Sequence, residues 1–197
     1  MITLCMDTSH KFLAVSLIKD DQVIASVQED CWKKQSEYIF PVITKMTEDN
    51  NIRPEDIDNV VITKGPGSFT GVRIAMTIAK VFCAMAGKQL YTLETLQLYA
   101  GKKDCTVLLD ARGKRAYTAR FHDGKPLTET AAVPLNEIEL SDEDIVIGDG
   151  HLAGLPDNYP DLAENFLALK NEWKAVENVH LLTPEYLKST SDYMVKK

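Results

Sequence analysis

The chain opens with short apolar runs separated by polar turns. Runs at 2–6, 12–18 and 23–28 alternate with turn residues at 7–10 and 20–21. Runs of about four to eight apolar or β-branched residues bounded by such turns are typical of strands. The pattern therefore predicts three consecutive strands that form an antiparallel meander.

From Ser36 to Met46 the apolar spacing changes to that of a helix. Apolar residues recur there at positions i, i+3, i+4 and i+7, and Ser36 is placed to cap the first turn. Pro41 leaves two alternatives open, a helix that begins at the proline or a longer helix that contains it. In the longer helix, Tyr38 and Phe40 lie off the apolar stripe, where we expect them to be exposed.

A strand at 60–63 and a glycine-rich turn lead into a second helix, predicted from 69 to about 86. Ser68 is placed as its N-cap and Gly87 as its C-cap. The polar residues of this helix fall on one narrow stripe at i, i+4 and i+7: Arg73, Thr77 and Lys80. One face of a sheet cannot cover so wide an apolar surface, so we expect a second surface to pack against this helix.

The turn before this helix, Gly65-Pro66-Gly67, has two interpretations. Glycine-rich turns at helix N-termini can bind phosphate, because free amides and the helix dipole favour anions. The spacing of Gly65, Gly67 and Gly71 fits neither the Walker loop nor the dinucleotide fingerprint, however. The sequence therefore favours a tight turn that lets the helix pack closely on the sheet.

The second half of the chain returns to strand patterns. Extended segments are predicted at 89–92, 105–109, 115–121, 127–133 and 145–147, with short helices at 93–100 and 161–170. Polarity and charge both change at 101–104, which predicts a boundary between an N-terminal part, 1–103, and a C-terminal part, 104–197. The first part holds 12 basic and 12 acidic residues and the second holds 10 and 17, so the net charge of −7 lies in the second.

Composition narrows the function classes. The acidic excess disfavours direct binding of nucleic acid, which usually needs a basic face. The first residues lack the basic segment of a signal peptide, and no apolar run approaches the ~20 residues of a membrane helix. The four cysteines are far apart in the sequence, which is typical of free thiols in a reducing cytoplasm. We therefore expect a cytoplasmic protein without membrane contact.

Two passages repeat the same arrangement of a strand, an aspartate, a turn and a second strand. One contains Asp7, followed by Thr8 and Ser9, and the other contains Asp110. Such a duplicated unit is similar to that of the actin-like, sugar-kinase and Hsp70 superfamily, whose two aspartate hairpins grip the phosphates of ATP. These residues are thus candidates for a vestigial nucleotide loop, although aspartate is also common in hairpin turns.

The ten residues from Gly65 to Ile74 closely resemble the signature of the bacterial TsaB (YeaZ) family. Further matches follow in family order over nearly the whole chain: Asp7-Thr8-Ser9, Asp110-Ala111-Arg112, Gly148-Asp149-Gly150 and the segment 184–188. The chain departs from the family pattern at Gln35, where many relatives have histidine, and at Ala75, where the signature usually has glycine. Its segment after Gly150 is also short.

The resemblance implies an α/β fold of the actin-like, sugar-kinase and Hsp70 (RNase H-like) type, with two related subdomains of mixed sheets flanked by helices. It also implies a non-catalytic subunit of the complex that installs N6-threonylcarbamoyladenosine at position 37 of tRNAs. The partners implied are a TsaD-type transferase subunit and a TsaE-type ATPase, with tRNA reached only through the complex. A homodimer is a further expectation, and no cofactor or metal is implied.

Side chains of the two helices are our candidates for the partner-binding face: Tyr38, Phe69, Arg73, Met76, Thr77 and Lys80. Phe69 and Met76 could equally be core residues, and Arg73 could clamp the glycine-rich loop. The signature loop itself comprises Gly65, Pro66, Gly67, Ser68 and Gly71.

Two enzymatic alternatives remain. An ATPase or phosphotransferase of the same superfamily would need glycine-rich hairpins around both aspartates, and Asp7-Thr8-Ser9-His10 lacks glycine. A peptidase would use Ser68 or Ser9 as nucleophile, but no histidine is placed in the sequence as its base. The histidines also lack the HxxxH spacing with which TsaD-type proteins hold a metal, so we expect no catalytic residue.

Overall fold

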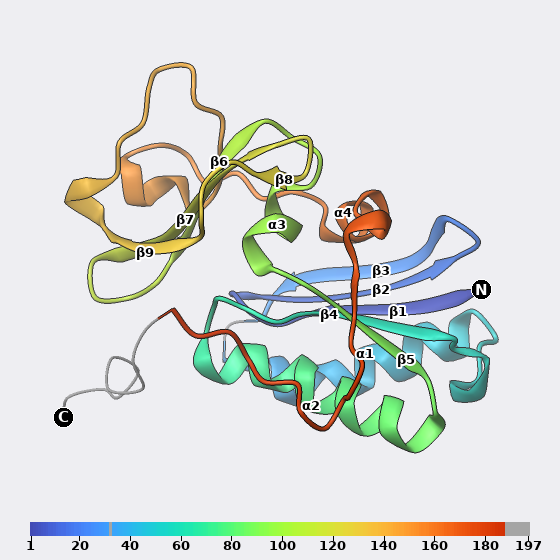
Figure 1. The fold of residues 1–197 in the computed structure, drawn as a ribbon. Helices are drawn as coiled ribbons and strands as arrows, with labels where there is room; N and C mark the ends of the chain where they lie inside the picture. The colour runs from blue at the N-terminus through green and yellow to red at the C-terminus, as the bar shows by residue number, and fades with distance from the viewer. Residues whose placement is uncertain (32, 188–197) are drawn as a thin grey trace.

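Two sheets and four α-helices organise the computed structural model, which describes residues 1–31 and 33–187 (Figure 1). The strands of the first sheet are β1 (Ile2–Asp7), β2 (Phe12–Lys19), β3 (Gln22–Asp30), β4 (Asn59–Thr63), β5 (Gln89–Leu93) and β11 (Lys174–Ala175). Those of the second are β6 (Cys105–Asp110), β7 (Arg115–His122), β8 (Lys125–Pro126), β9 (Ala131–Pro134) and β10 (Val146–Gly148). The helices are α1 (Gln35–Asp49), α2 (Phe69–Ala86), α3 (Thr95–Ala100) and α4 (Leu162–Ala168). Short 3₁₀ turns occur at Pro54–Asp56, Leu135–Glu137, Gly150–Ala153 and Lys170–Glu172.

The predicted meander is confirmed, and it forms one side of a mixed sheet. β1 pairs antiparallel with β2, and β2 with β3. β4 then adds to the other edge of β1 in parallel, and β5 adds in parallel to β4, giving the order β11-β5-β4-β1-β2-β3. β1 is therefore a central strand, which explains why its residues are buried on both faces of the sheet.

Alternate residues of β1 contribute to two different cores. Leu4 and Met6 join the core under α1 and α2, together with Ile39 and Val72. Cys5 faces the opposite core, which α3, α4 and the second sheet complete. In Figure 1, α1 and α2 cover one face of the first sheet, while α3 and α4 lie on its other face, where α3 also contacts the second sheet.

The two long helices follow the predictions closely, with one correction. α1 is the longer alternative, with Pro41 inside it and with Tyr38 and Phe40 exposed. The predicted Ser36 cap is wrong, because the helix begins one residue earlier, at Gln35, whose buried side-chain amide donates to the carbonyl of His10 (3.0 Å).

Both predicted caps of α2 are confirmed. The Ser68 side chain accepts from the amide of Gly71, and Gly87 adopts the left-handed conformation with φ of 64°. α2 is also the one helix, among the residues described, with the length and apolar composition of a membrane-crossing helix. Its inward residues, such as Ala75 and Ala79, pack in the core against β4 and β1, as core helices of comparable length do.

The C-terminal part differs most from the prediction. The run expected at 127–133 is replaced by the short strands β8 and β9. In the N-terminal part, the predicted helix at 93–100 begins only at Thr95. β11 was not predicted, and it pairs with β5, so that the chain returns to the first sheet after completing the second. The proposed division at residue 103 stays a prediction.

Candidate functional site

The signature loop and the first hairpin meet through backbone contacts. The amide of Ser68 donates to the carbonyl of Ser9 (2.7 Å), and the Thr8 hydroxyl donates to the carbonyl of Gly71 (2.6 Å). A Cβ atom on Gly67 would lie 2.4 Å from the Ser9 carbonyl oxygen, and one on Gly71 would lie 2.1 Å from that of Thr8. The glycines thus permit close packing of α2 on the hairpin, which agrees with the tight-turn interpretation.

The Asp7 side chain lies in the protein interior and is not exposed at a candidate binding site. It is fully buried, and its Oδ1 accepts from the Thr63 hydroxyl and from the amide of Ser9 (3.1 Å). Its Oδ2 has no hydrogen-bond partner, and burial raises the pKa of this carboxyl above its usual range. Asp7 therefore serves the geometry of the hairpin turn, the structural role weighed for it above.

A cleft of about 820 Å³ opens beside this packed junction. The first hairpin, the start of α1, the N-terminus of α2 and the second hairpin form its walls. Of the predicted loop residues, it includes Ser9, Gly67, Ser68, Gly71 and Asp110. Asp7 and Thr8 are not among the lining residues, so the two aspartates of the repeated hairpins do not both face the cleft.

Asp149, in the Gly148-Asp149-Gly150 match, is the centre of the polar network in the cleft. Its Oδ2 accepts from His10 Nε2 (2.8 Å) and from the amide of Asp110 (2.6 Å), and its Oδ1 accepts from the Tyr159 hydroxyl. Burial alone would raise the pKa of Asp149, but these hydrogen bonds and the nearby His10 outweigh it and lower the pKa to about 2. The bond from His10 joins the first hairpin to the second sheet.

Sequence reasoning missed the contact between His10 and Asp149. His10 and Asp149 both belong to motifs noted in the sequence, yet 139 positions separate them, and only the packing of the two sheets brings them together.

Asp110, by contrast, mainly orders its own turn, since its Oδ1 accepts from the amide of Arg112 (2.7 Å). Its carboxylate also pairs with the Arg112 guanidinium at 3.5 Å.

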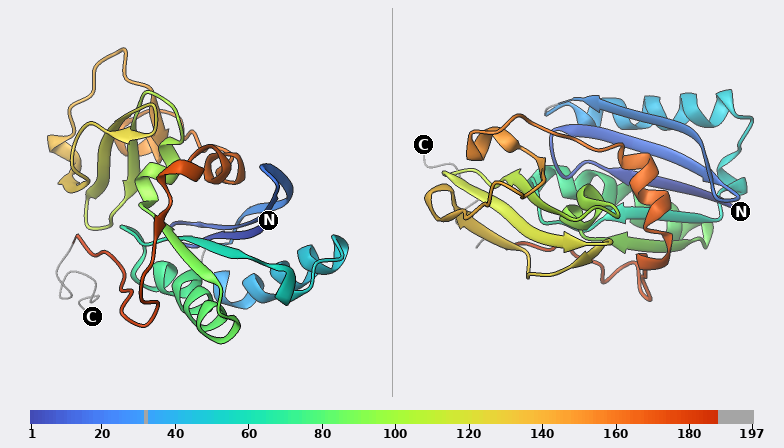
Figure 2. Two further views of the ribbon diagram at one scale, coloured as in Figure 1. Left: turned by 45° about the vertical axis from the view of Figure 1, so that its right-hand side comes forward. Right: turned by 90° about the horizontal axis from the view of Figure 1, so that it is seen from above.

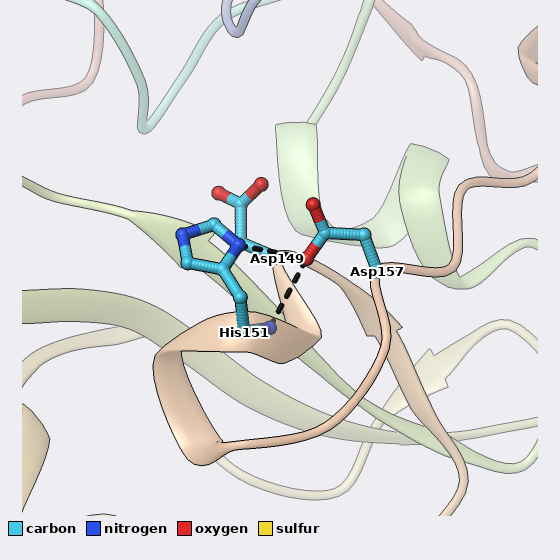
Figure 3. A group of neighbouring side chains, drawn as sticks. All are labelled: Asp149, His151 and Asp157. Atoms are coloured by element: carbon cyan, nitrogen blue, oxygen red, sulfur yellow. Dashed lines mark hydrogen bonds and ion pairs between the residues drawn. The ribbon is translucent and has the colours of Figure 1, made fainter.

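Within the part of the chain that the structure describes, Asp149, His151 and Asp157 form a group whose ligand atoms could reach one metal ion (Figure 3). One ligand atom from each lies within 4.8 Å of the others, and nitrogen and oxygen donors of this kind suit divalent ions such as Zn²⁺. His151 Nδ1 is already bonded to Asp157 Oδ1 at 2.7 Å, which raises the pKa of His151. Because each group has a hydrogen-bond partner, the cluster is complete as a hydrogen-bonded network.

The predicted partner-binding residues divide between a groove and the core. A groove of about 410 Å³ runs between α1 and α2, and Phe69, Arg73 and Thr77 line it. Tyr38 is 46% exposed on α1. Met76 is buried in the core, the alternative stated for it above, and Lys80 donates to carbonyls near the C-terminus.

The model of the family "TsaD: tRNA N6-adenosine threonylcarbamoyltransferase" matches residues 23–139. The Bacillus subtilis tRNA threonylcarbamoyladenosine biosynthesis protein TsaB is 28% identical, over 95% of this chain and 94% of its own. TsaB of Escherichia coli K12 is 30% identical, over 87% of this chain and 79% of its own.

Solved structures share the fold. YeaZ from Pseudomonas aeruginosa has a TM-score of 0.74 at 20% identity, covering 94% of this chain and 99% of its own. A Pseudomonas aeruginosa protein described as similar to peptidase YeaZ reaches 0.80 at 19% identity, covering 95% and 99%. The expected α/β fold, with mixed sheets flanked by helices, is thereby confirmed, and the chain belongs to the TsaB (YeaZ) family of tRNA threonylcarbamoyladenosine biosynthesis proteins.

Proposed function

We propose that this chain is a non-catalytic subunit of the complex that makes N6-threonylcarbamoyladenosine at position 37 of tRNAs, where it binds and supports a TsaD-type transferase subunit. The observation that carries the proposal is the exposed apolar face of α1 and α2. Phe40 is 59% exposed beside the groove, and Val81 and Met85 are 53% and 85% exposed further along α2. Apolar side chains gathered in this way are typical of protein interfaces.

The state of the cleft supports a non-catalytic role. The amide of Ser68 is bonded to the Ser9 carbonyl and the amide of Gly71 to the Ser68 hydroxyl, so neither amide is free to bind a phosphate group in the cleft. The Asp149 carboxylate accepts three hydrogen bonds from protein groups, so it is poorly placed to act as a base. These features favour a binding subunit over the ATPase and peptidase alternatives.

The remaining partners follow from the same proposal. A TsaE-type ATPase would join the pair, and tRNA would be reached only through the complex, in keeping with the acidic net charge of −7. In a reducing cytoplasm the four cysteines would stay free thiols, the state in which the structure has them. A homodimer through the same helices would compete with the transferase subunit for this face.

Size-exclusion chromatography with light scattering, using the cognate TsaD-type subunit, tests the proposal. The wild type should form a complex with it, and Tyr38→Ala/Phe40→Asp should lose that complex because a carboxylate would be desolvated in the apolar face. Leu127→Asp, at an exposed residue of the other subdomain, is the matched control and should bind normally. Absence of a wild-type complex, with or without nucleotide, would reject the proposal.

A further inference from the structure

The segment after β11 runs back along α2 and ends beside its N-terminus (Figures 1 and 2). We call residues 178–187 the C-terminal strap. Lys80 of α2 donates to the carbonyls of His180 (3.2 Å) and Leu182 (2.7 Å). Further along, the amide of Glu185 donates to the Lys64 carbonyl (2.8 Å), and their side chains form an ion pair at 2.7 Å. The strap is therefore held at both ends of its course over the helix.

Tyr186 of the strap contacts two of the predicted partner-binding residues. Its ring stacks on Phe69 with centroids 5.2 Å apart, and its hydroxyl accepts from Arg73 Nε at 2.7 Å. The guanidinium of Arg73 lies in turn over the Phe69 ring, 4.0 Å from its centroid. The three side chains form one cluster, in which each holds the other two.

This cluster borders the groove between α1 and α2. Phe69 and Arg73 both line the groove, whereas Tyr186 supports them from outside it. Arg73 is an exposed residue, and an arginine that is not held in one rotamer loses side-chain entropy when a partner binds. A wall ordered before the partner arrives removes part of that cost.

The residues that line the groove indicate what it would bind. Arg73 is the one charged side chain among the described residues that line it, and the others are apolar, such as Ile74 and Ile78, or small and polar. A helix that combines apolar and acidic side chains would be complementary in both polarity and charge.

We propose that the C-terminal strap is a positioning element of the partner-binding face. Tyr186 holds Phe69 and Arg73 as a preformed wall, against which an apolar and acidic helix of the transferase subunit docks. The inference rests on the proposed function and makes Tyr186 a positioning residue, which acts on the partner only through Phe69 and Arg73.

Calorimetric titration of the TsaD-type subunit into strap variants tests this. Tyr186→Ala removes the stack and the hydrogen bond, and should raise Kd about tenfold, whereas Tyr186→Phe keeps the stack and should raise it about threefold. The matched control is Leu181→Ala, at a strap residue that is 76% exposed, and its Kd should be unchanged. Circular dichroism establishes that all variants are folded.

Three results would overturn the inference. Equal affinity of Tyr186→Ala and wild type would show that the strap does not order the face. Tighter binding by Tyr186→Ala would show that the strap covers the face instead of supporting it. If Tyr186→Ala weakened only the self-association of the chain, the molecule that docks in the groove would be a second copy of the chain. That result would also reject the proposal that a transferase helix docks there.

Hydrogen exchange on the isolated chain separates failure of this inference from failure of the proposed function. If the wild type binds no transferase subunit, the proposed function fails, but the ordering role of Tyr186 is still measurable. Amides of residues 69–78 should exchange faster in Tyr186→Ala than in Leu181→Ala, because the first turns of α2 lose their support. Equal exchange in the two variants would overturn the strap as a positioning element.

Discussion

Asp7 and Asp149 show how one residue type can meet opposite environments within a single fold. Asp7 is buried with one carboxylate oxygen unpaired, and its pKa is raised by burial. Asp149 is as deeply buried, yet three donors on its two oxygens hold its pKa at about 2. The difference lies in the donors that the tertiary structure brings to each residue. The raised pKa of Asp7 means that its ionisation destabilises the fold, whereas the lowered pKa of Asp149 means that its ionisation stabilises the fold.

The Asp149 network should make the protein sensitive to acid. Because the folded pKa, about 2, lies below the usual value of 3.8, this carboxylate stabilises the fold above pH 4, and that contribution is lost as the pH falls toward 2. Asp149→Asn should therefore cost about 2 kcal/mol at pH 7, and the cost should shrink as the pH is lowered from 4 to 3. Urea unfolding at several pH values measures it.

The control for this prediction is Asp142→Asn, which changes an exposed carboxylate. It should shift the unfolding free energy by no more than about 0.5 kcal/mol at any pH, as surface substitutions usually do. A loss in Asp149→Asn that stayed constant from pH 7 to pH 3 would contradict the role assigned to the carboxylate charge.

At the scale of elements, the structure depends on how closely α2 approaches the first hairpin. The Ser68 cap and the Gly87 C-cap define the helix locally, but the Thr8 hydroxyl and the Ser9 carbonyl determine where it lies. Thr8 Oγ1 also accepts from the amide of Ala75 (3.2 Å), one turn further along the helix. The glycines of the signature loop are thus required by contact with another element.

Gly71→Ala should destabilise the protein although alanine is the better helix former. On propensity alone the change favours the helix by up to about 1 kcal/mol. The new Cβ would lie 2.1 Å from the Thr8 carbonyl oxygen, so the hairpin or the helix must move, at a cost of about 1–3 kcal/mol. Thermal unfolding measures the net loss.

Ala84→Gly, at an exposed position of the same helix, provides the comparison. It should cost about 1 kcal/mol through propensity alone, so both substitutions should lower the melting temperature, although they change propensity in opposite directions. A higher melting temperature for Gly71→Ala would show that the close approach of the hairpin does not determine how a side chain at this position affects stability.

For the molecule as a whole, the main core is shared between the two sheets. Cys5 and Ala14 of the first sheet, Val107 of the second and Phe166 of α4 belong to one buried cluster. The Gln28 side chain also bonds to backbone on either side of the α4 N-terminus, at Pro160 and Leu162. The buried cluster contains residues of both sheets, and after the second sheet the chain returns to the first sheet as β11. We therefore expect the two halves to unfold together.

Unfolding should therefore be a single cooperative transition. Trp173 reports on the junction, because it contacts Tyr91 of the first sheet and donates to the carbonyl of Phe166 (3.1 Å). In a Trp32→Phe background it is the one remaining tryptophan, and its fluorescence should change at the same midpoint as far-UV circular dichroism. Loss of the fluorescence signal well before the circular dichroism signal would indicate that the halves unfold separately.

Much of the fold could be predicted because its signals are local. Apolar runs between turns predicted the meander, and residues that set helix ends predicted both caps of α2. The start of α1 and the strand β11 were missed for a common reason. Gln35 is held by a carbonyl of the first hairpin, and Lys174–Ala175 is a strand only because β5 offers it an edge.

The sequence by itself determined the family, the fold class and the two helices of the proposed partner-binding face, since these depend on local patterns and on one highly specific ten-residue run. Only the tertiary structure decided that Asp7 is buried while Asp149 is bound by His10, that Met76 belongs to the core, and that Tyr186 supports Phe69 and Arg73. Those contacts join residues far apart in the chain, so they depend on the register and packing of whole elements, which no local pattern encodes.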